Sequence, residues 1–192
     1  MKHRIFIAIN LPDNIKNKFS KYENKWFDLP CRWTRPENFH ITLAFLGFLT
    51  DEEILKVCDI TKEIAKNKES FLIKLDQITY GPNNSMPRMI WAIGPKNKEL
   101  GKLQTELANA LGGLTSELKE ERQMGFAPHI TLGRLKEWEF RAIEPEERPN
   151  IQEEINFDFE VESIEVMQSD LKKEGPDYSI LETIPLGEPL KI

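Results

Sequence analysis

Residues 40–43 read His40-Ile41-Thr42-Leu43, and residues 129–132 repeat the same four letters as His129-Ile130-Thr131-Leu132. Almost half of the 192-residue chain separates the two copies, and together they hold two of its three histidines. Both copies lie in stretches that predict β-strands, over residues 39–46 and 128–135. The repeat therefore predicts a duplicated fold, with one copy of the motif in each half.

The two-residue period of a β-strand determines which face of the strand each side chain of the motif occupies. Successive side chains point to opposite faces, so His40 and Thr42 share one face while Ile41 and Leu43 share the other. The apolar face enters the core and fixes the register of the strand. If the two halves face each other about a pseudo-twofold axis, we expect both histidine-threonine pairs to meet in one cleft.

The rest of the chain indicates an α+β fold in which antiparallel sheets face a central cleft and helices lie outside. We expect residues 1–192 to form a single bilobal domain, because no Gly-, Ser- or Pro-rich linker divides them. We read 136–154 as a charged loop with at most one short helix, and 162–163 as a bulge within strand 155–168. The hydrophobic pattern predicts further strands at 4–9, 71–80, 88–93 and 178–184, and helices at 12–28, 51–64 and 100–111.

Charge and composition argue against duplex-wrapping, membrane-spanning and metal-dependent classes of protein. The net charge is −6, whereas a protein that wraps duplex nucleic acid usually carries a broad basic footprint. An acidic chain can still hold one nucleic-acid end in a local basic pocket. The sequence contains no apolar run long enough to span a bilayer and no metal-binding motif. We expect a cytoplasmic monomer with neither a metal nor a cofactor, in which Cys31 and Cys58 form no disulfide.

Paired imidazoles suit acid-base chemistry at phosphorus. The ordinary pKa of histidine lies near neutrality, so one ring can be neutral while the other is protonated. In-line displacement places the attacking and leaving oxygens on opposite sides of phosphorus, which two opposed rings can serve. Thr42 and Thr131 can donate hydrogen bonds to the non-bridging phosphate oxygens. A single such motif is usually structural, whereas two copies favour His40 and His129 as a catalytic pair.

The chain also resembles the 2H phosphoesterases, specifically the RNA 2′,3′-cyclic phosphodiesterase branch historically called 2′-5′ RNA ligases. This resemblance implies a bilobal α+β fold, with His40 protonating the leaving 3′ oxygen, His129 activating water, and a 2′-phosphomonoester as product. The spacing alone leaves open which histidine is the acid. The matching stretches are 4–12 (RIFIAINLP), 33–47 (WTRPENFHITLAFLG), 87–92 (PRMIWA), 126–134 (FAPHITLGR), 167–171 (MQSDL) and 175–178 (GPDY).

Other side chains are secondary candidates. Arg134 can contact a phosphate or can be a surface ion-pair partner, and Phe45 can stack on a base or fill the core. Arg32 and Arg35 can add positive potential near the first motif or can be merely solvated. Arg88 and Trp91 resemble a feature of the same family, but a core tryptophan beside a strand arginine is the commoner explanation.

We therefore expect RNA ends or small cyclic nucleotides as substrates, with hydrolysis of RNA 2′,3′-cyclic phosphates as the leading hypothesis. Within the enzyme class, the alternatives are 2′-5′ RNA ligation and action on another cyclic nucleotide. The alternative from another class is a non-catalytic RNA-end-binding module, which would have no need of two proton carriers.

Overall fold

The computed structural model describes residues 1–83, 86–114, 128–172 and 175–187. Phe126 and Ala127, which belong to one of the matching stretches, lie outside this part of the chain. The strands are β1 (Lys2–Asn10), β2 (Cys31–Trp33), β3 (His40–Thr50), β4 (Phe71–Gly81), β5 (Met89–Ile93), β6 (His129–Leu135), β7 (Gln152–Val161), β8 (Ser163–Lys172) and β9 (Gly175–Pro185). The helices are α1 (Asp13–Phe19), α2 (Tyr22–Lys25), α3 (Asp51–Ala65), α4 (Lys98–Leu111) and α6 (Glu137–Arg141), with 3-10 turns η1 (Pro36–Asn38) and η2 (Pro145–Glu147).

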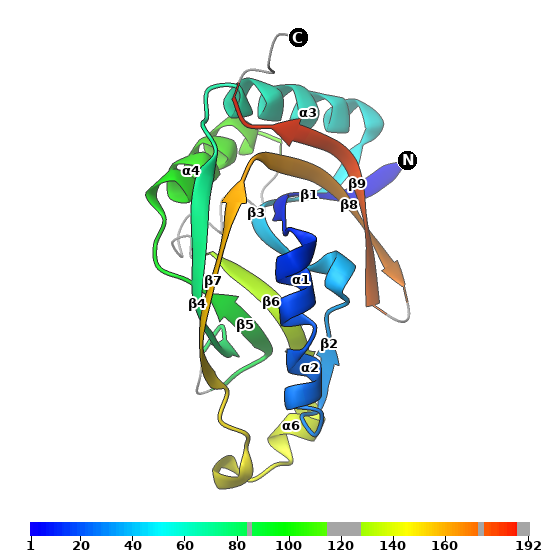
Figure 1. The fold of residues 1–192 in the computed structure, drawn as a ribbon. Helices are drawn as coiled ribbons and strands as arrows, with labels where there is room; N and C mark the ends of the chain where they lie inside the picture. Colours follow the sequence, from blue (N-terminus) through cyan, green and yellow to red (C-terminus); the bar gives the residue numbers. More distant parts are fainter. Residues whose placement is uncertain (84–85, 115–127, 173–174, 188–192) are drawn as a thin grey trace.

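The described strands and helices form the predicted α+β architecture, and the strands pair antiparallel in one continuous sheet. The strand order is β7-β4-β5-β6-β3-β1-β8-β9, and β2 pairs with β6 (Figure 1). The two halves of this order join where β3 meets β6, and the join has a single register pair, Ile41 with Ile130. Both isoleucines are fully buried. The join therefore lies inside the two repeated motifs.

The strand next to each motif follows the same pairing pattern. Ala8 of β1 lies opposite Thr42, as Trp91 of β5 lies opposite Thr131. A helical connection leads from β1 to β3 through α1 and α2, and α4 connects β5 to β6. This correspondence supports the duplicated, two-lobed description, which stays a prediction.

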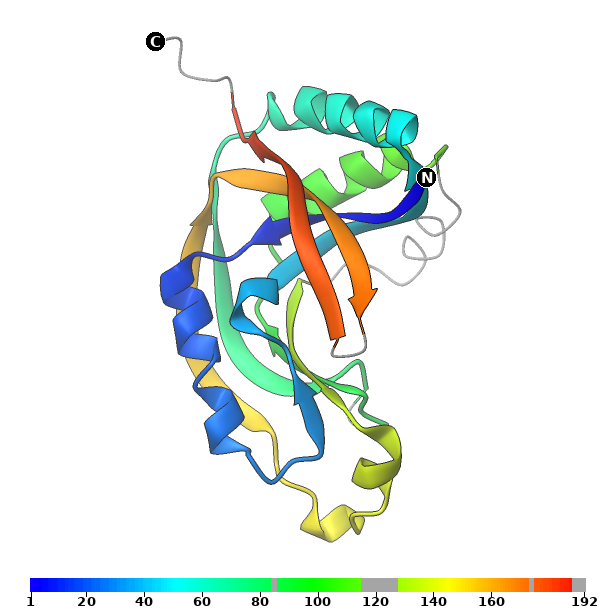
Figure 2. The same cartoon turned by 90° about the vertical axis from the view of Figure 1, so that its right-hand side faces the viewer.

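Helices cover the ends and one flank of the sheet. α3 and α4 pack against each other at one end, α6 lies at the opposite end, and α1 and α2 run along a flank (Figures 1 and 2). A capping box begins α3: Thr50 accepts a hydrogen bond from the backbone N–H of Glu53, whose carboxylate accepts one from the N–H of Thr50 at 2.8 Å. No described helix is long and apolar enough to cross a membrane.

Two sequence-based boundaries were wrong within the first fifty residues. The predicted helix 12–28 is interrupted after Phe19, where the Ser20 hydroxyl donates to the Asn17 carbonyl and competes with helical hydrogen bonding. The strand predicted over 39–46 does not end at Leu46, because β3 continues to Thr50. Gly47 has φ of 69°, which suits an irregularity within the strand.

The second half of the chain requires two further corrections. Strand 155–168 is two strands, because β7 pairs with β4 while β8 pairs with β1, and the chain changes sheet halves at Glu162. Residues 162–163, which were expected to form a bulge, instead carry the chain from one half of the sheet to the other. The charged segment 136–154 holds α6, the turn η2 and the start of β7, so it is more ordered than a loop.

We predict that Ile41→Ala lowers the free energy of unfolding by roughly 3 kcal/mol, since it removes a fully buried side chain at the junction of the halves. Urea unfolding followed by circular dichroism measures this change. Leu55→Ala, at a side chain that is 66% exposed, is the matched control and should change stability by less than about 0.5 kcal/mol. Equal effects of the two substitutions would contradict the central role of this pair.

Candidate active site

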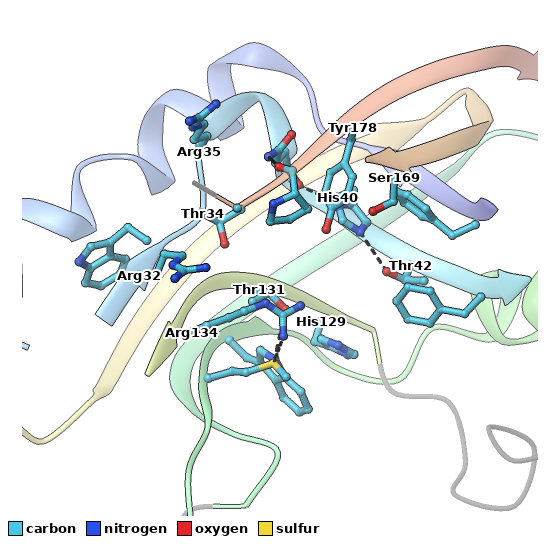
Figure 3. A pocket seen from close by; sticks show the side chains of 18 of the residues that line it. Arg32, Thr34, Arg35, His40, Thr42, His129, Thr131, Arg134, Ser169 and Tyr178 are labelled. Atoms are coloured by element: carbon cyan, nitrogen blue, oxygen red, sulfur yellow. Dashed lines mark hydrogen bonds between the residues drawn. The ribbon is translucent and has the colours of Figure 1, made fainter. Parts of the chain in front are cut away.

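All six sequence-predicted site residues line one cavity of about 230 Å³. They are His40, Thr42, Phe45, His129, Thr131 and Arg134. Figure 3 shows His40 and Thr42 on one side of this cavity, with His129, Thr131 and Arg134 on the other. The antiparallel pairing of Ile41 with Ile130 explains this arrangement, because one step along either strand sets the histidine of one motif beside the threonine of the other.

A β-bulge in each motif brings a third side chain to the cavity. The pairing of β1 with β3 skips Leu43, and the pairing of β5 with β6 skips Leu132. Each skip reverses the strand alternation that follows it. Phe45 and Arg134, both three residues beyond a motif threonine, therefore face the same side as the histidines. The reading of Phe45 as a core residue is wrong, since its side chain is 39% exposed.

Hydrogen bonds define the tautomer of His40. Its Nδ1 lies 2.7 Å from the backbone carbonyl of Asn38, and only a protonated nitrogen can donate to that oxygen. Its Nε2 lies 3.0 Å from the hydroxyl of Thr42. In the neutral ring, Nε2 is therefore the basic nitrogen and accepts from Thr42. The buried Asn38 is itself held by its side-chain donation to the Pro176 carbonyl at 3.0 Å.

The surroundings of His40 disfavour its charged form. Its ring centroid lies 5.1 Å from that of Phe6 and 5.2 Å from that of Tyr178. Burial is the largest effect and lowers the pKa of His40 from 6.5 to about 4. The hydrogen bond to Asn38 acts in the opposite direction and raises the pKa. The nearby positive charges of His129 and Arg134 lower the pKa further.

His129 is held by a different contact. Its ring stacks on Trp91, with centroids 4.0 Å apart and an interplanar angle of 28°. Trp91 in turn donates its indole N–H to the sulfur of Met89 at 3.3 Å. An aromatic face positions the second imidazole, whereas a backbone carbonyl positions the first.

The cavity is electropositive. Every charged side chain among its described lining residues is an arginine, in a protein of net charge −6. These residues are Arg4, Arg32, Arg35 and Arg134. Arg88 does not line this cavity. The part of the chain that the structure describes holds no cluster of three or more His, Cys, Asp or Glu side chains suited to a metal. Two imidazoles, two threonine hydroxyls and four guanidinium groups form a site that suits an anion such as a phosphate diester.

The sequence reasoning missed several side chains of this site. Phe6 looked like an ordinary residue of the strand predicted at 4–9, and Tyr178 like the start of the strand predicted at 178–184. Both contact His40. Ser169 lies opposite Tyr178 in the sheet and lines the cavity, and its buried hydroxyl has no hydrogen-bond partner among the described residues. All three lie in stretches quoted for the resemblance, which was the one signal that could have found them.

Comparison with known proteins gives consistent matches over nearly the whole chain. The model of the LigT-like phosphoesterase family matches twice, over residues 7–91 and 93–178. A protein of Methanocaldococcus jannaschii named RNA 2′,3′-cyclic phosphodiesterase is 31% identical over 93% of this chain and 98% of its own. A protein of Aquifex aeolicus with the same name is 30% identical over 96% and 97%. A crystal structure of a Thermus thermophilus protein superposes with a TM-score of 0.82 at 26% identity, covering 97% of this chain and all of that one.

We predict that the low pKa of His40 makes stability depend on pH. The folded pKa is about 4 against an ordinary 6.5, so between these values the unfolded chain binds a proton that the folded protein does not. The free energy of unfolding should fall as the pH is lowered from 6.5 to 4, and less so in His40→Asn. Urea unfolding at a series of pH values measures this, with an NMR titration of the His40 ring. A midpoint near 6.5 for His40 would contradict the assignment.

Proposed function

The chain belongs to the LigT-like phosphoesterase family, and from this premise we propose that it hydrolyses RNA 2′,3′-cyclic phosphate ends to 2′-phosphomonoesters, with His40 and His129 as general acid and base. One observation carries the proposal: the two histidine-threonine pairs share a cavity whose charged lining is entirely arginine. The names of the curated relatives support the substrate. The cytoplasmic location and the monomeric state stay predictions.

In the proposed reaction, the cyclic phosphate lies between the two imidazoles. The hydroxyls of Thr42 and Thr131 hydrogen-bond its non-bridging oxygens. His129 takes a proton from a water molecule, whose oxygen forms a bond to phosphorus. The bond between phosphorus and the 3′ oxygen breaks, and His40 gives its Nε2 proton to that oxygen. The phosphate remains on the 2′ oxygen. Before the next cycle, His129 releases its proton to solvent and His40 takes one up from solvent.

His40 is mostly neutral near pH 7 in the free protein, because its pKa is about 4. A bound phosphate diester brings a negative charge next to the ring, which raises that pKa toward the working pH. The anchor to the Asn38 carbonyl uses Nδ1 and leaves Nε2 for substrate, so proton gain at Nε2 keeps the ring orientation. This geometry keeps Nε2 available for proton exchange with the substrate, and the proton-donor role is the one that the resemblance to the 2H phosphoesterases implies.

The bound RNA end extends beyond the phosphate. Phe45 is partly exposed at the cavity and can stack on the terminal base. Arg134, at the equivalent position of the second motif, can balance the charge of the phosphate. Its Nη1 contacts the sulfur of Met89 at 3.8 Å, and no acidic partner holds it among the described residues.

We predict that His40→Ala and His129→Ala each lower kcat by about 10²–10⁴-fold, because each removes one proton carrier. The double variant should be little worse than either single one, since the pair acts as a unit. The value of kcat is measured with a 2′,3′-cyclic-phosphate oligoribonucleotide in EDTA, and the position of the phosphate in the product is identified.

His3→Ala is the matched control. His3 is the third histidine, lies outside the cavity and pairs with Asp51 at 3.2 Å. It should leave kcat unchanged. Near-normal turnover by either motif variant would contradict the paired mechanism, and tight binding of the cyclic end without any turnover by the unaltered protein would favour a non-catalytic module.

A substrate with sulfur in place of the 3′ bridging oxygen tests the assignment of roles. A thiolate leaves without protonation, so we predict that His40→Ala loses much less activity on this substrate than on the oxygen substrate. His129→Ala should be impaired on both, because water still needs a base. Comparison of kcat for the two substrates measures this, and the reverse pattern would assign the acid role to His129.

A further inference from the structure

A second cavity, of about 400 Å³, lies at the end of the molecule that carries α6. Its charged lining consists of Arg88, Glu137, Arg141 and Arg148, and Phe140 contributes an aromatic wall. Arg88 directly precedes β5, and the other residues belong to α6 and to the charged segment 136–154. Nothing in the proposed reaction uses this cavity.

Two of its three arginines lack an acidic partner. Arg141 forms an ion pair with Glu137 at 2.5 Å. Arg148 donates from Nε to the Ile143 carbonyl at 3.0 Å and lies over the Phe140 ring at 5.1 Å, so its position is held without its charge being neutralised. Arg88 is exposed and has no ion pair among the described residues. The cavity therefore carries about two uncompensated positive charges in a protein of net charge −6.

This cavity adjoins the active-site cavity at the start of β5. Met89 lines the active-site cavity and its chain neighbour Arg88 lines the second cavity, so the two cavities meet at this point. Two exposed arginines of the active-site lining, Arg32 and Arg134, form a row that ends at Met89. Arg32 of β2 lies directly opposite Arg134 of β6, and Arg134 lies opposite Met89. Like charges directly opposite on adjacent strands destabilise a sheet, so this row favours an anion that bridges it.

We infer that the cavity formed by Arg88 and Arg148 binds a backbone phosphate of an RNA chain, upstream of the cyclic phosphate in the active site. The inference rests on the proposed function, since it takes a phosphate end in the first cavity as its starting point. RNA carries one negative charge at every nucleotide, so a chain leaving the active site along the arginine row brings a second phosphate to the second cavity. The enzyme is then selective for cyclic-ended oligoribonucleotides over cyclic mononucleotides.

The test compares kcat/KM for a 2′,3′-cyclic mononucleotide and for an octanucleotide with the same cyclic terminal nucleotide. The unaltered protein should prefer the octanucleotide. Arg88→Gln should lower kcat/KM on the octanucleotide by roughly fivefold and leave the mononucleotide unchanged. The slope of log kcat/KM against log salt on the octanucleotide should also decrease by about 0.7, as expected when one contact to a single strand is lost.

Arg148→Gln provides a second variant in the same cavity, and Lys56→Gln on α3 is the control with the same change of charge at the far end of the molecule. Lys56→Gln should alter neither substrate. Equal loss on both substrates in Arg88→Gln, or no preference for the octanucleotide in the unaltered protein, would overturn the inference. Failure of the proposed function is distinguishable, because the unaltered protein would then hydrolyse neither substrate.

Discussion

The arrangement of the site depends on one backbone pairing, the contact of β3 with β6 through Ile41 and Ile130. The two strands run antiparallel and share this single register pair, and both side chains are fully buried. A slip of one residue would turn each histidine toward the core and each isoleucine toward the cavity. The packing of two isoleucines therefore determines where both imidazoles lie. The same join divides the sheet into halves, so the fold and the site have a common origin.

Much of the fold was predictable because strands and helices leave strong local patterns. The apolar period of α3 and α4 and the alternation in most strands identified those elements correctly. One error concerns which strand pairs with which. The alternation of β7 continues into β8, and a period of two carries no information on the change of partner at Glu162. β2 is only three residues long, which is too short to give a periodic signal.

The histidines and threonines of the candidate site were predictable because they belong to the repeated motif. All six candidate residues line one cavity, although strict alternation would have turned Phe45 and Arg134 away from the histidines. The bulges at Leu43 and Leu132 reverse that alternation, and they arise from pairing with neighbouring strands that are distant in sequence. The contact of Tyr178 with His40 is also purely tertiary. The low pKa of His40 follows from burial and could not be read from residue types.

A crystal structure with a nucleoside 2′,3′-cyclic vanadate, which mimics five-coordinate phosphorus, tests the central claim most directly. The proposed mechanism predicts that Nε2 of His40 and a ring nitrogen of His129 lie roughly 2.6–3.2 Å from opposite apical oxygens of the vanadate. The hydroxyls of Thr42 and Thr131 should contact the equatorial oxygens. A complex in which only one imidazole reaches an apical oxygen, with the other turned away from the vanadate, would contradict catalysis by the pair.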